Sequence, residues 1–291
     1  MSALQLHPES MAETGDRVGR RRISSTLVVG AALVGLVVLG CLVSFFWTPY
    51  DPTVVDVSIR LRGPSARHWL GTDSFGHDVF SVILQGSRTT LIVGLISVAV
   101  AAVIGVPIGL VAGIAGRGAG TWLMRWNDIM QAFPALLLAI IFGAIWGGST
   151  VTAMTALGIG TAPAFARVTR AGTLQVMSRE YVLAARAAGR GRLFLAMRHV
   201  LPNVGGVLIV QASVNFAVAV LAEAALSYLG LGTPAPTPSW GRMLQESQTY
   251  VFNDPLLIVW PGCAIALTVL GFNLLGDGLR DLLDPRSEVQ R

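Results

Sequence analysis

Four side chains early in the chain carry chemistry that could bind a metal ion. His68 and His77 lie close in sequence to Asp73 and Asp78, and imidazole and carboxylate groups are common metal ligands. Their spacing matches none of the usual ligand patterns, so we interpret them as polar loop residues and expect no metal site. We also find no Ser/His/Asp set, paired carboxylates or HExxH sequence at a common membrane depth. We therefore predict no catalytic residue and no enzyme activity on this chain.

The basic residues exclude further functions. All 21 Lys and Arg positions are arginine, and a Walker A phosphate loop requires a lysine. Whatever powers this protein must therefore lie on another chain, and we expect no cofactor on this one. The formal net charge of +5 could suggest nucleic acid, but the arginines flank apolar runs instead of forming one face. We expect no nucleic-acid partner.

The composition is that of a membrane protein. Of 291 residues, 53% are hydrophobic and 13% are charged, and the mean hydropathy is +0.64. Such a chain is too apolar for a soluble domain. We predict an all-α, polytopic protein in the lipid bilayer with six transmembrane helices, at residues 23–46, 89–114, 129–146, 151–166, 204–226 and 256–275.

The distribution of arginine predicts the orientation. Placing the N-terminus in the cytoplasm puts most arginines on the cytoplasmic side, as the positive-inside rule requires. The predicted divisions are a cytoplasmic tail, an uncleaved anchor helix, an extracytoplasmic loop, a membrane domain and a second cytoplasmic tail, at residues 1–22, 23–46, 47–88, 89–275 and 276–291.

Local patterns predict details of these divisions. Residues 78–87 are expected to form a short interfacial helix, and residues 230–255 to form a rigid cap too rich in proline for a helix. Asp128 is expected to cap the third span at its N-terminus. Pro107 suggests a kink in the second span, whose glycines should permit close helix packing: Gly94, Gly105, Gly109 and Gly113.

Residues 179–203 form the one long arginine-rich segment between two membrane-length apolar runs. Good helix formers from Glu180 to Ala188 precede Gly189 and Gly191, and a second short amphipathic pattern follows. Pro202 suits the first turn of the next helix. The pattern predicts a helix, a bend and a second helix that leads into a membrane span. Arginine content alone would favour a plain loop that fixes topology.

The internal pattern of this segment resembles the cytoplasmic "EAA" loop of ABC importer permeases, which docks into a cleft on the ATPase subunit. In this sequence Leu183 replaces the glutamate that gives the loop its name, and we expect Glu180, one turn earlier, to substitute for it. The resemblance implies ATPase-coupling roles for Glu180, Ala184, Ala185, Arg186, Gly189, His199, Leu201 and Pro202.

Three further stretches, at residues 68–91, 221–241 and 271–286, resemble signatures of the C-type permease subunit of oligopeptide and dipeptide ABC importers. The resemblance implies a type I importer architecture in a bacterial inner membrane. It also implies a B-type permease partner, two ATPase subunits that bind ATP and magnesium, an extracytoplasmic peptide-binding protein and a peptide substrate. Nickel and glutathione importers share this subunit type and remain alternatives. A secondary transporter is a weaker one, because no inverted repeat or chain of intramembrane acids and bases is present.

Polar residues in the fifth predicted span are candidates for the translocation path. Gln211 and Asn215 are four residues apart and lie about 40° apart around a helix axis, because each residue turns the helix by about 100°. They could line a water-filled path or bond neighbouring helices. Glu223 lies near the outer end of this span, where it could meet the charged end of a peptide or cap the proline-rich loop. Both alternatives stay open for these three residues.

Overall fold

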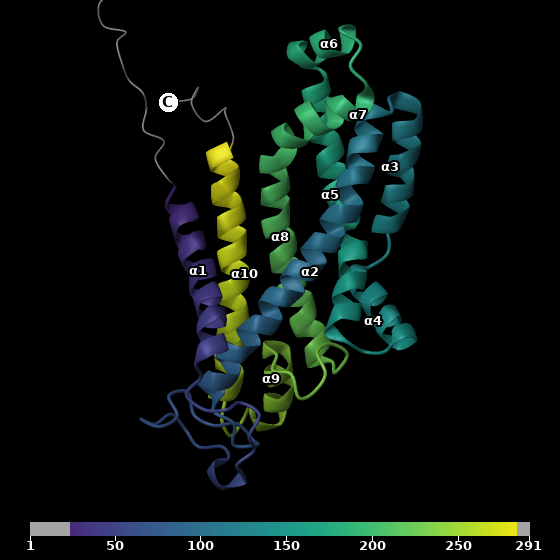
Figure 1. Ribbon diagram of the computed structural model, residues 1–291. Helices are drawn as coiled ribbons and strands as arrows, with labels where there is room; N and C mark the ends of the chain where they lie inside the picture. The colour runs from purple at the N-terminus through teal and green to yellow at the C-terminus, as the bar shows by residue number, and fades with distance from the viewer. Residues whose placement is uncertain (1–23, 284–291) are drawn as a thin grey trace, which may run out of the picture.

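The computed structural model describes residues 24–283, so the predicted tail at residues 1–22 and the last part of the second tail lie outside it. Within this range the regular structure is helical, apart from an isolated β-bridge between Thr72 and Asp78. The longer helices form one bundle, in which all but α4 run along roughly one direction (Figure 1). They are α1 (Ser25–Phe46), α2 (Val79–Ile114), α3 (Arg117–Gln131), α4 (Ala135–Trp146), α5 (Thr150–Met177), α8 (Leu201–Tyr228) and α10 (Leu256–Leu283).

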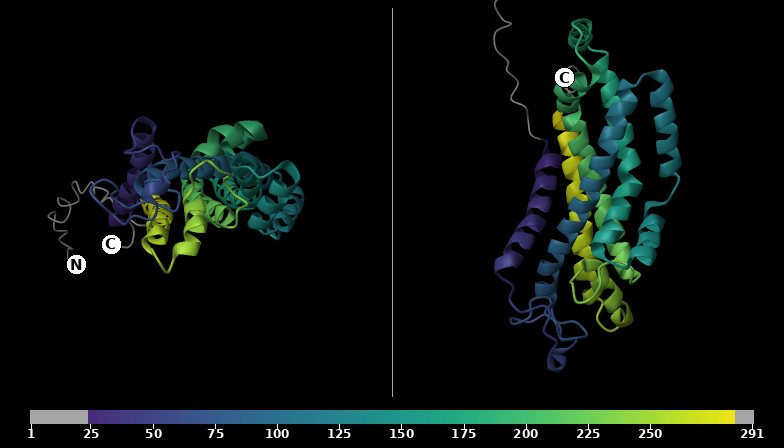
Figure 2. Two further views of the ribbon diagram at one scale, coloured as in Figure 1. Left: turned by 90° about the horizontal axis from the view of Figure 1, so that it is seen from below. Right: turned by 45° about the vertical axis from the view of Figure 1, so that its right-hand side comes forward.

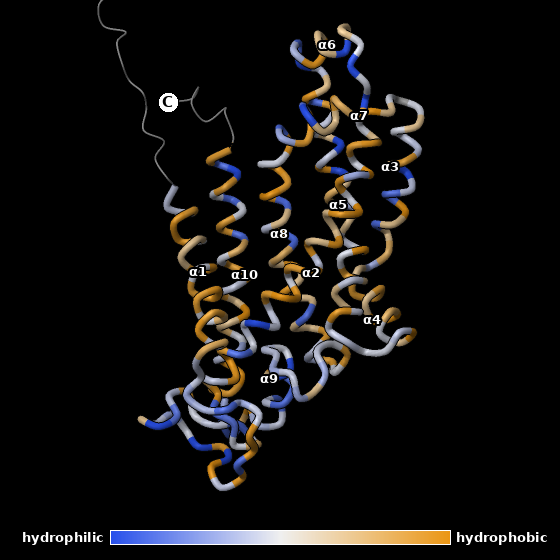
Figure 3. The backbone as a smooth tube through the Cα atoms, in the orientation of Figure 1, coloured by the Kyte–Doolittle hydropathy of each residue, from blue (hydrophilic) through white to orange (hydrophobic). Residues whose placement is uncertain are grey.

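Hydropathy confirms a membrane protein but not six equally apolar spans. Four helical stretches are long and apolar enough to cross a bilayer: α1, α2, α10 and the stretch Arg192–Tyr228. The pair α3 and α4 adds a fifth if the two count as one broken span. Apolar residues dominate these helices, whereas polar residues gather at the two ends of the molecule (Figure 3).

The sixth predicted span lies in α5, which does not reach the same hydropathy although it is 28 residues long. This helix lies inside the bundle against α2, α4 and α8, and it buries Leu157 and Phe165. Glycine, alanine and threonine are frequent in it. Helix contacts within membranes favour such small residues, which lowers the mean hydropathy of a helix that other helices surround.

The predicted glycine packing of α2 is confirmed. A Cβ atom at Gly105 would clash with the carbonyl oxygen of Ala162, and one at Gly109 would clash with that of Ala166. Both contacts are with α5, so only a residue without a side chain permits this approach. Helix α2 continues without a break past Pro107.

Helix α2 also begins earlier than the sequence suggests. Residues 79–87 are its first turns and not a separate interfacial helix, because Asp78 caps the N-terminus. The Asp78 carboxylate accepts hydrogen bonds from the backbone N–H and the hydroxyl of Ser81, at 2.9 and 2.7 Å. The predicted loop 47–88 therefore ends at residue 78, and we call this segment the 47–78 loop.

The third predicted span is broken. Pro134 follows a two-residue gap after α3, and α3 and α4 are bent by 73° with respect to each other. Asp128 lies near the C-terminal end of α3, so the expectation that it caps a helix N-terminus is wrong. Its carboxylate instead forms an ion pair with Arg167 of α5, with 2.7 Å between the Asp128 Oδ1 and Arg167 Nη2 atoms.

The two ends of the bundle carry different structures (Figure 2). One end holds α6 (Glu180–Ala187) and α7 (Arg192–Leu195), together with the start of α1 and the finish of α10, and we call it the elbow end. The other, the loop end, holds the 47–78 loop and α9 (Trp240–Ser247). The cap predicted at residues 230–255 thus contains a helix, because no proline lies between Pro238 and Pro255 and residues 240–247 are free to form one.

Candidate coupling elbow and translocation path

The segment predicted to couple transport to ATP is a helical elbow. As the sequence predicts, α6 is followed by a bend and then by α7. Gly189 lies in the bend with φ +78°, a conformation that strongly favours glycine. The backbone N–H of Gly189 donates to Arg186 O at 3.0 Å, and that of Arg190 donates to Ala185 O at 3.2 Å. These bonds close the C-terminus of α6 and set the direction in which the chain turns.

One side of the elbow is fastened to the membrane helices. Val182, Leu195 and Val200 are each at most 1% exposed and belong to a core cluster with Leu110 of α2 and Val176 of α5. The elbow is therefore packed against the bundle and is not a freely extended loop. This packing distinguishes it from a plain basic loop that only fixes topology.

The opposite side of the elbow presents apolar side chains to solvent. Leu193 is 77% exposed, and Tyr181, Leu183, Phe194 and Met197 are between 42% and 56% exposed. In Figure 1, α6 lies beyond the ends of the membrane helices and α7 lies level with the upper end of α3. Exposed apolar patches rimmed by polar residues mark protein interaction sites. We call these five side chains the elbow surface.

The predicted coupling residues of α6 lie on or beside this surface. Glu180 is in the first turn, where a carboxylate favours the positive end of the helix dipole. Its side chain is exposed, as are Ala184 and Arg186, whereas Ala185 is half-buried. Leu183, at the position of the missing glutamate, is exposed as well. Glu180 and Leu183 are three residues apart, so the carboxylate lies about one turn from the position of the glutamate that is absent.

The remaining coupling residues lead from the elbow into α8. His199 is half-buried, and its ring centroid lies 5.8 Å from that of Tyr181 and 5.7 Å from that of Phe194. Leu201 and Pro202 occupy the first turn of α8, as the sequence predicts for the proline. Residues Arg192–Tyr228 form one continuous helical stretch. A movement of the elbow therefore has a direct helical connection to the loop end.

The structure brings two of the three predicted path residues together. The Gln211 Nε2 atom donates to the Asn215 Oδ1 atom at 3.0 Å. Asn215 is 6% exposed, and its Nδ2 atom is buried without a hydrogen-bond partner. An unpaired buried amide is costly, so this group is available to an acceptor that reaches it.

Glu223 lies apart from that pair and is 3% exposed. Its Oε1 atom accepts hydrogen bonds from the hydroxyls of Ser227, Thr233 and Ser239, at 2.6, 2.9 and 2.7 Å. Thr233 and Ser239 belong to the proline-rich segment after α8. The geometry favours the alternative in which this carboxylate fastens that segment to α8. Sequence reasoning missed the three hydroxyls, because no spacing rule connects them to Glu223.

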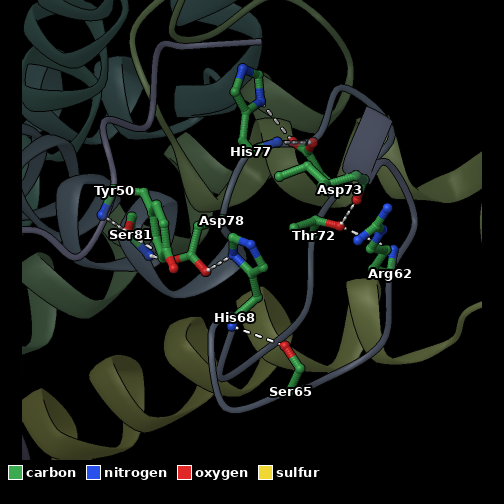
Figure 4. Close-up of polar contacts among 10 residues, drawn as sticks. Tyr50, Arg62, Ser65, His68, Thr72, Asp73, His77, Asp78 and Ser81 are labelled. Carbon is green, nitrogen blue, oxygen red and sulfur yellow. Dashed lines mark hydrogen bonds and ion pairs between the residues drawn. The ribbon is translucent and has the colours of Figure 1, made fainter. Parts of the chain in front are cut away.

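The 47–78 loop is held by a second polar network (Figure 4). The His68 Nδ1 atom lies 3.0 Å from Asp78 Oδ1, and the His77 Nδ1 atom lies 2.8 Å from Asp73 Oδ2. The four candidate metal ligands thus form two separate pairs. Within residues 24–283 no group of three or more His, Cys, Asp and Glu side chains is arranged to hold a metal ion.

The same loop encloses a cleft of about 560 Å³, lined by Tyr50, Asp51, Val54, Asp56, Ile59, Arg67, His68, Gly76 and Asp78. Two of its carboxylates are held by short turns. The hydroxyl and then the backbone N–H of Ser58 lower the pKa of Asp56 below its ordinary value. The corresponding groups of Thr53 do the same for the pKa of Asp51.

Long apolar helices, a polar pair within α8 and a helical elbow with an exposed apolar surface define a multi-pass membrane transport subunit. The chain belongs to the family of binding-protein-dependent transport system inner membrane components, whose model matches residues 105–289. The family is one of transport permease subunits.

Named relatives match most of the chain. A dipeptide transport system permease protein of Alkalihalophilus pseudofirmus is 42% identical over 88% of this chain and 86% of its own length. A di/tripeptide transport system permease protein of Pseudomonas aeruginosa is 42% identical over 89% of this chain and 88% of its own. A glutathione transport system permease protein of Pectobacterium atrosepticum is 41% identical over 88% and 87%.

The fold is also found among solved structures. A chain of the MetNI methionine ABC transporter, in an inward-facing conformation, superposes with a TM-score of 0.59. It is 18% identical in sequence, and the match covers 70% of this chain and 96% of that one. The predicted architecture of a type I ABC importer permease is therefore confirmed as a fold, with α1 and the 47–78 loop extending the chain before the region of the family match.

Proposed function

We propose that this chain is the C-type permease of an ATP-driven importer for dipeptides or oligopeptides and forms half of its translocation path. The observation that carries the proposal is the continuous helical stretch Arg192–Tyr228, which links the elbow surface to the polar pair Gln211 and Asn215 and on to the loop end. Relatives at 42% identity named for dipeptide and di/tripeptide transport support the choice of substrate.

The orientation follows from charge. The elbow end carries the arginine-rich segment and faces the cytoplasm, and the loop end faces outward. Both chain termini are then cytoplasmic, in a bacterial inner membrane. The 47–78 loop and α9 face an extracytoplasmic peptide-binding protein that delivers the substrate.

The partner chains supply what this chain lacks. A B-type permease completes the path, and two ATPase subunits bind ATP and magnesium and dock on the elbow surface. Closure of the ATPases moves the elbow, and the stretch Arg192–Tyr228 tilts so that the path opens outward. The ATPase site and the translocation path then both shift the balance between two arrangements of this one helical stretch. Coupling between two sites requires such a shared element. The unpaired Asn215 amide offers a donor to a peptide carbonyl in the path.

The alternative cargo is glutathione, because a glutathione transport system permease is 41% identical to this chain. Glutathione is a modified tripeptide, so the same backbone-binding amides would suit it. Nickel is a further alternative that the family resemblance raised. Neither alternative changes the mechanism of coupling.

The test is substrate-stimulated ATP hydrolysis by the co-expressed complex in lipid vesicles with its binding protein. The panel contains dipeptides, tripeptides, longer peptides, glutathione and nickel ions, and vesicles without the binding protein are the control. Stimulation by peptides alone supports the proposal. Stimulation by glutathione or nickel keeps the importer and changes the cargo, and a chain that purifies without any ATPase refutes the proposal.

A further inference from the structure

The junction between the elbow and α8 is not an ordinary α-helix. Residues Ala196–Val200 form a π-helical turn, in which the backbone N–H of Leu201 donates to Ala196 O, five residues earlier. Pro202 accounts for this turn. It has no N–H to donate to Arg198, and its ring would clash with that carbonyl in a regular α-helix, so the turn widens.

One side chain bonds to a carbonyl oxygen within this turn. The carbonyl is that of His199, four residues before Asn203. Here the Asn203 Nδ2 atom donates to that oxygen at 2.6 Å. Asn203 therefore holds the junction through its side chain, at a point where Pro202 interrupts the backbone ladder.

His199 connects this bond to both elbow helices. Its carbonyl is bonded to Asn203 of α8, while its ring contacts Tyr181 of α6 and Phe194 of α7. Buried Val200 and Leu195 fix the neighbouring turns against the bundle. A change in the Asn203–His199 distance would therefore alter the angle between the elbow and α8. Single-turn π-helices within longer helices are frequent at functional sites.

We infer that Asn203 is a positioning residue for coupling: its side-chain bond to His199 sets the π-helical turn so that elbow movement is transmitted along α8. The inference rests on the proposed function, since it presumes that ATPases move the elbow. Asn203 is exposed and lies outside the set of coupling residues that the sequence predicts. A side-chain donor after Leu-Pro is the signal that could have identified it.

The test compares variants that differ in the ability to donate to His199 O. Asn203→Asp has nearly the same shape but no donor when ionised, and Asn203→Ala has neither donor nor charge. Asn203→Ser restores a donor, because serine hydroxyls bond to the carbonyl four residues earlier in helices. The three variants thus separate loss of the bond from a change of size.

The measurement uses spin labels at Leu36 of α1 and at Leu229, directly after α8, in a complex that lacks Cys41 and Cys263. Leu36 and Leu229 are 59% and 62% exposed, so both sites accept a label. The distance between them is measured without nucleotide and after trapping with ATP and vanadate, with the binding protein present. Co-purified ATPase and the rate of ATP hydrolysis report whether the elbow is docked.

We expect Asn203→Asp and Asn203→Ala to keep ATPase docking and to hydrolyse ATP within about twofold of the wild type, while the population of the trapped distance falls at least about threefold. Asn203→Ser should retain the wild-type distances. If Asn203→Asp does not assemble, Asn203→Ala carries the test.

Two results would overturn the inference. The first is a wild-type change of distance in the variants that lack the donor. The second is a fall in the population of the trapped distance that is as large in Asn203→Ser as in Asn203→Ala. A wild-type complex with neither ATP hydrolysis nor a distance change would instead refute the proposed function itself.

Discussion

The elbow end and the loop end of this protein are built in opposite ways. At the loop end, three hydroxyls converge on one oxygen of Glu223, and two His–Asp pairs hold the 47–78 loop. At the elbow end, large apolar side chains are exposed, and one side-chain bond, from Asn203 to His199, joins α8 to the π-helical turn.

The difference separates a preorganised surface from one that needs a partner. Buried polar networks with satisfied groups fix a single arrangement. Exposed leucine and phenylalanine side chains gain free energy only when another surface covers them. We therefore expect substitutions at the loop end to change the stability of this chain, and substitutions on the elbow surface to change its assembly with partners.

The largest effect is expected at Glu223. Glu223→Ala removes the acceptor of three buried hydroxyls, and hydrogen bonds to charged groups contribute about 1.5–3 kcal/mol each. Because the hydroxyls can partly find other partners, we expect the free energy of unfolding to fall by about 3 kcal/mol. Thermal unfolding of the purified chain in detergent, followed by tryptophan fluorescence, measures it.

The matched control for this prediction is Glu246→Ala, which removes a half-buried ion pair with Arg242 on α9. Such a pair contributes at most about 1 kcal/mol, so the control should unfold near the wild-type temperature. Equal midpoints for the two variants would show that the Glu223 network does not hold the loop end together.

A smaller effect is expected in the 47–78 loop at Gly76. Its φ is +85°, and a Cβ atom there would clash with the Asp56 carbonyl group. Gly76→Ala should therefore destabilise the loop by about 1–3 kcal/mol. Faster proteolytic cleavage within residues 47–78 measures the change. Gly63→Ala is the control, since no atom lies within 4 Å of its added Cβ, and cleavage at the same rate in both variants would contradict the prediction.

The sequence predicts the helical parts of this comparison well. The run of helix formers from Glu180, the interruption at Gly189 and the proline at residue 202 are local signals, and the structure has the expected helix, bend and helix. The glycines of α2 also predict its close approach to another helix, here α5, because glycines spaced four residues apart lie on one face of a helix.

The features that the sequence does not predict depend on contacts between distant residues. The bonds of Glu223 reach 16 residues to Ser239, and Asp128 pairs with Arg167 on another helix. The sequence does not predict the break between α3 and α4, because the apolar run continues through Pro134. Hydropathy carries no information on the direction of a helix axis. Periodicity describes one helix at a time, so it cannot identify such partners.

On the elbow surface we expect an effect on assembly with little effect on stability. Leu193→Ser removes the most exposed of the five apolar side chains, at 77%. Loss of its burial against an ATPase should weaken binding by about 1–2 kcal/mol, roughly tenfold in Kd. Titration of the solubilised permease pair with ATPase subunits measures it. Leu283→Ser, at the same end but on α10, is the control, and equal weakening by both variants would remove the elbow surface from the interface.

The smallest expected effect concerns pH and the turn that holds Asp56. The hydroxyl and then the backbone N–H of Ser58 lower the pKa of Asp56, so the carboxylate is favoured more in the folded loop than in the unfolded chain. The resulting stability is fully present above the unfolded pKa of about 3.9 and is lost as the pH falls through the lower folded value. Hydrogen exchange of residues 54–60, corrected for its intrinsic pH dependence, should therefore show weaker protection near pH 3 than at pH 6. Ser58→Ala removes the largest cause of the shift and should reduce this difference. An unchanged pH dependence in that variant would mean that only the backbone and the buried pairs fix the 47–78 loop. Gly76 and Asp78 would then account for the preorganisation of the loop end, and the exposed turn at Asp56 and Ser58 would not contribute to it.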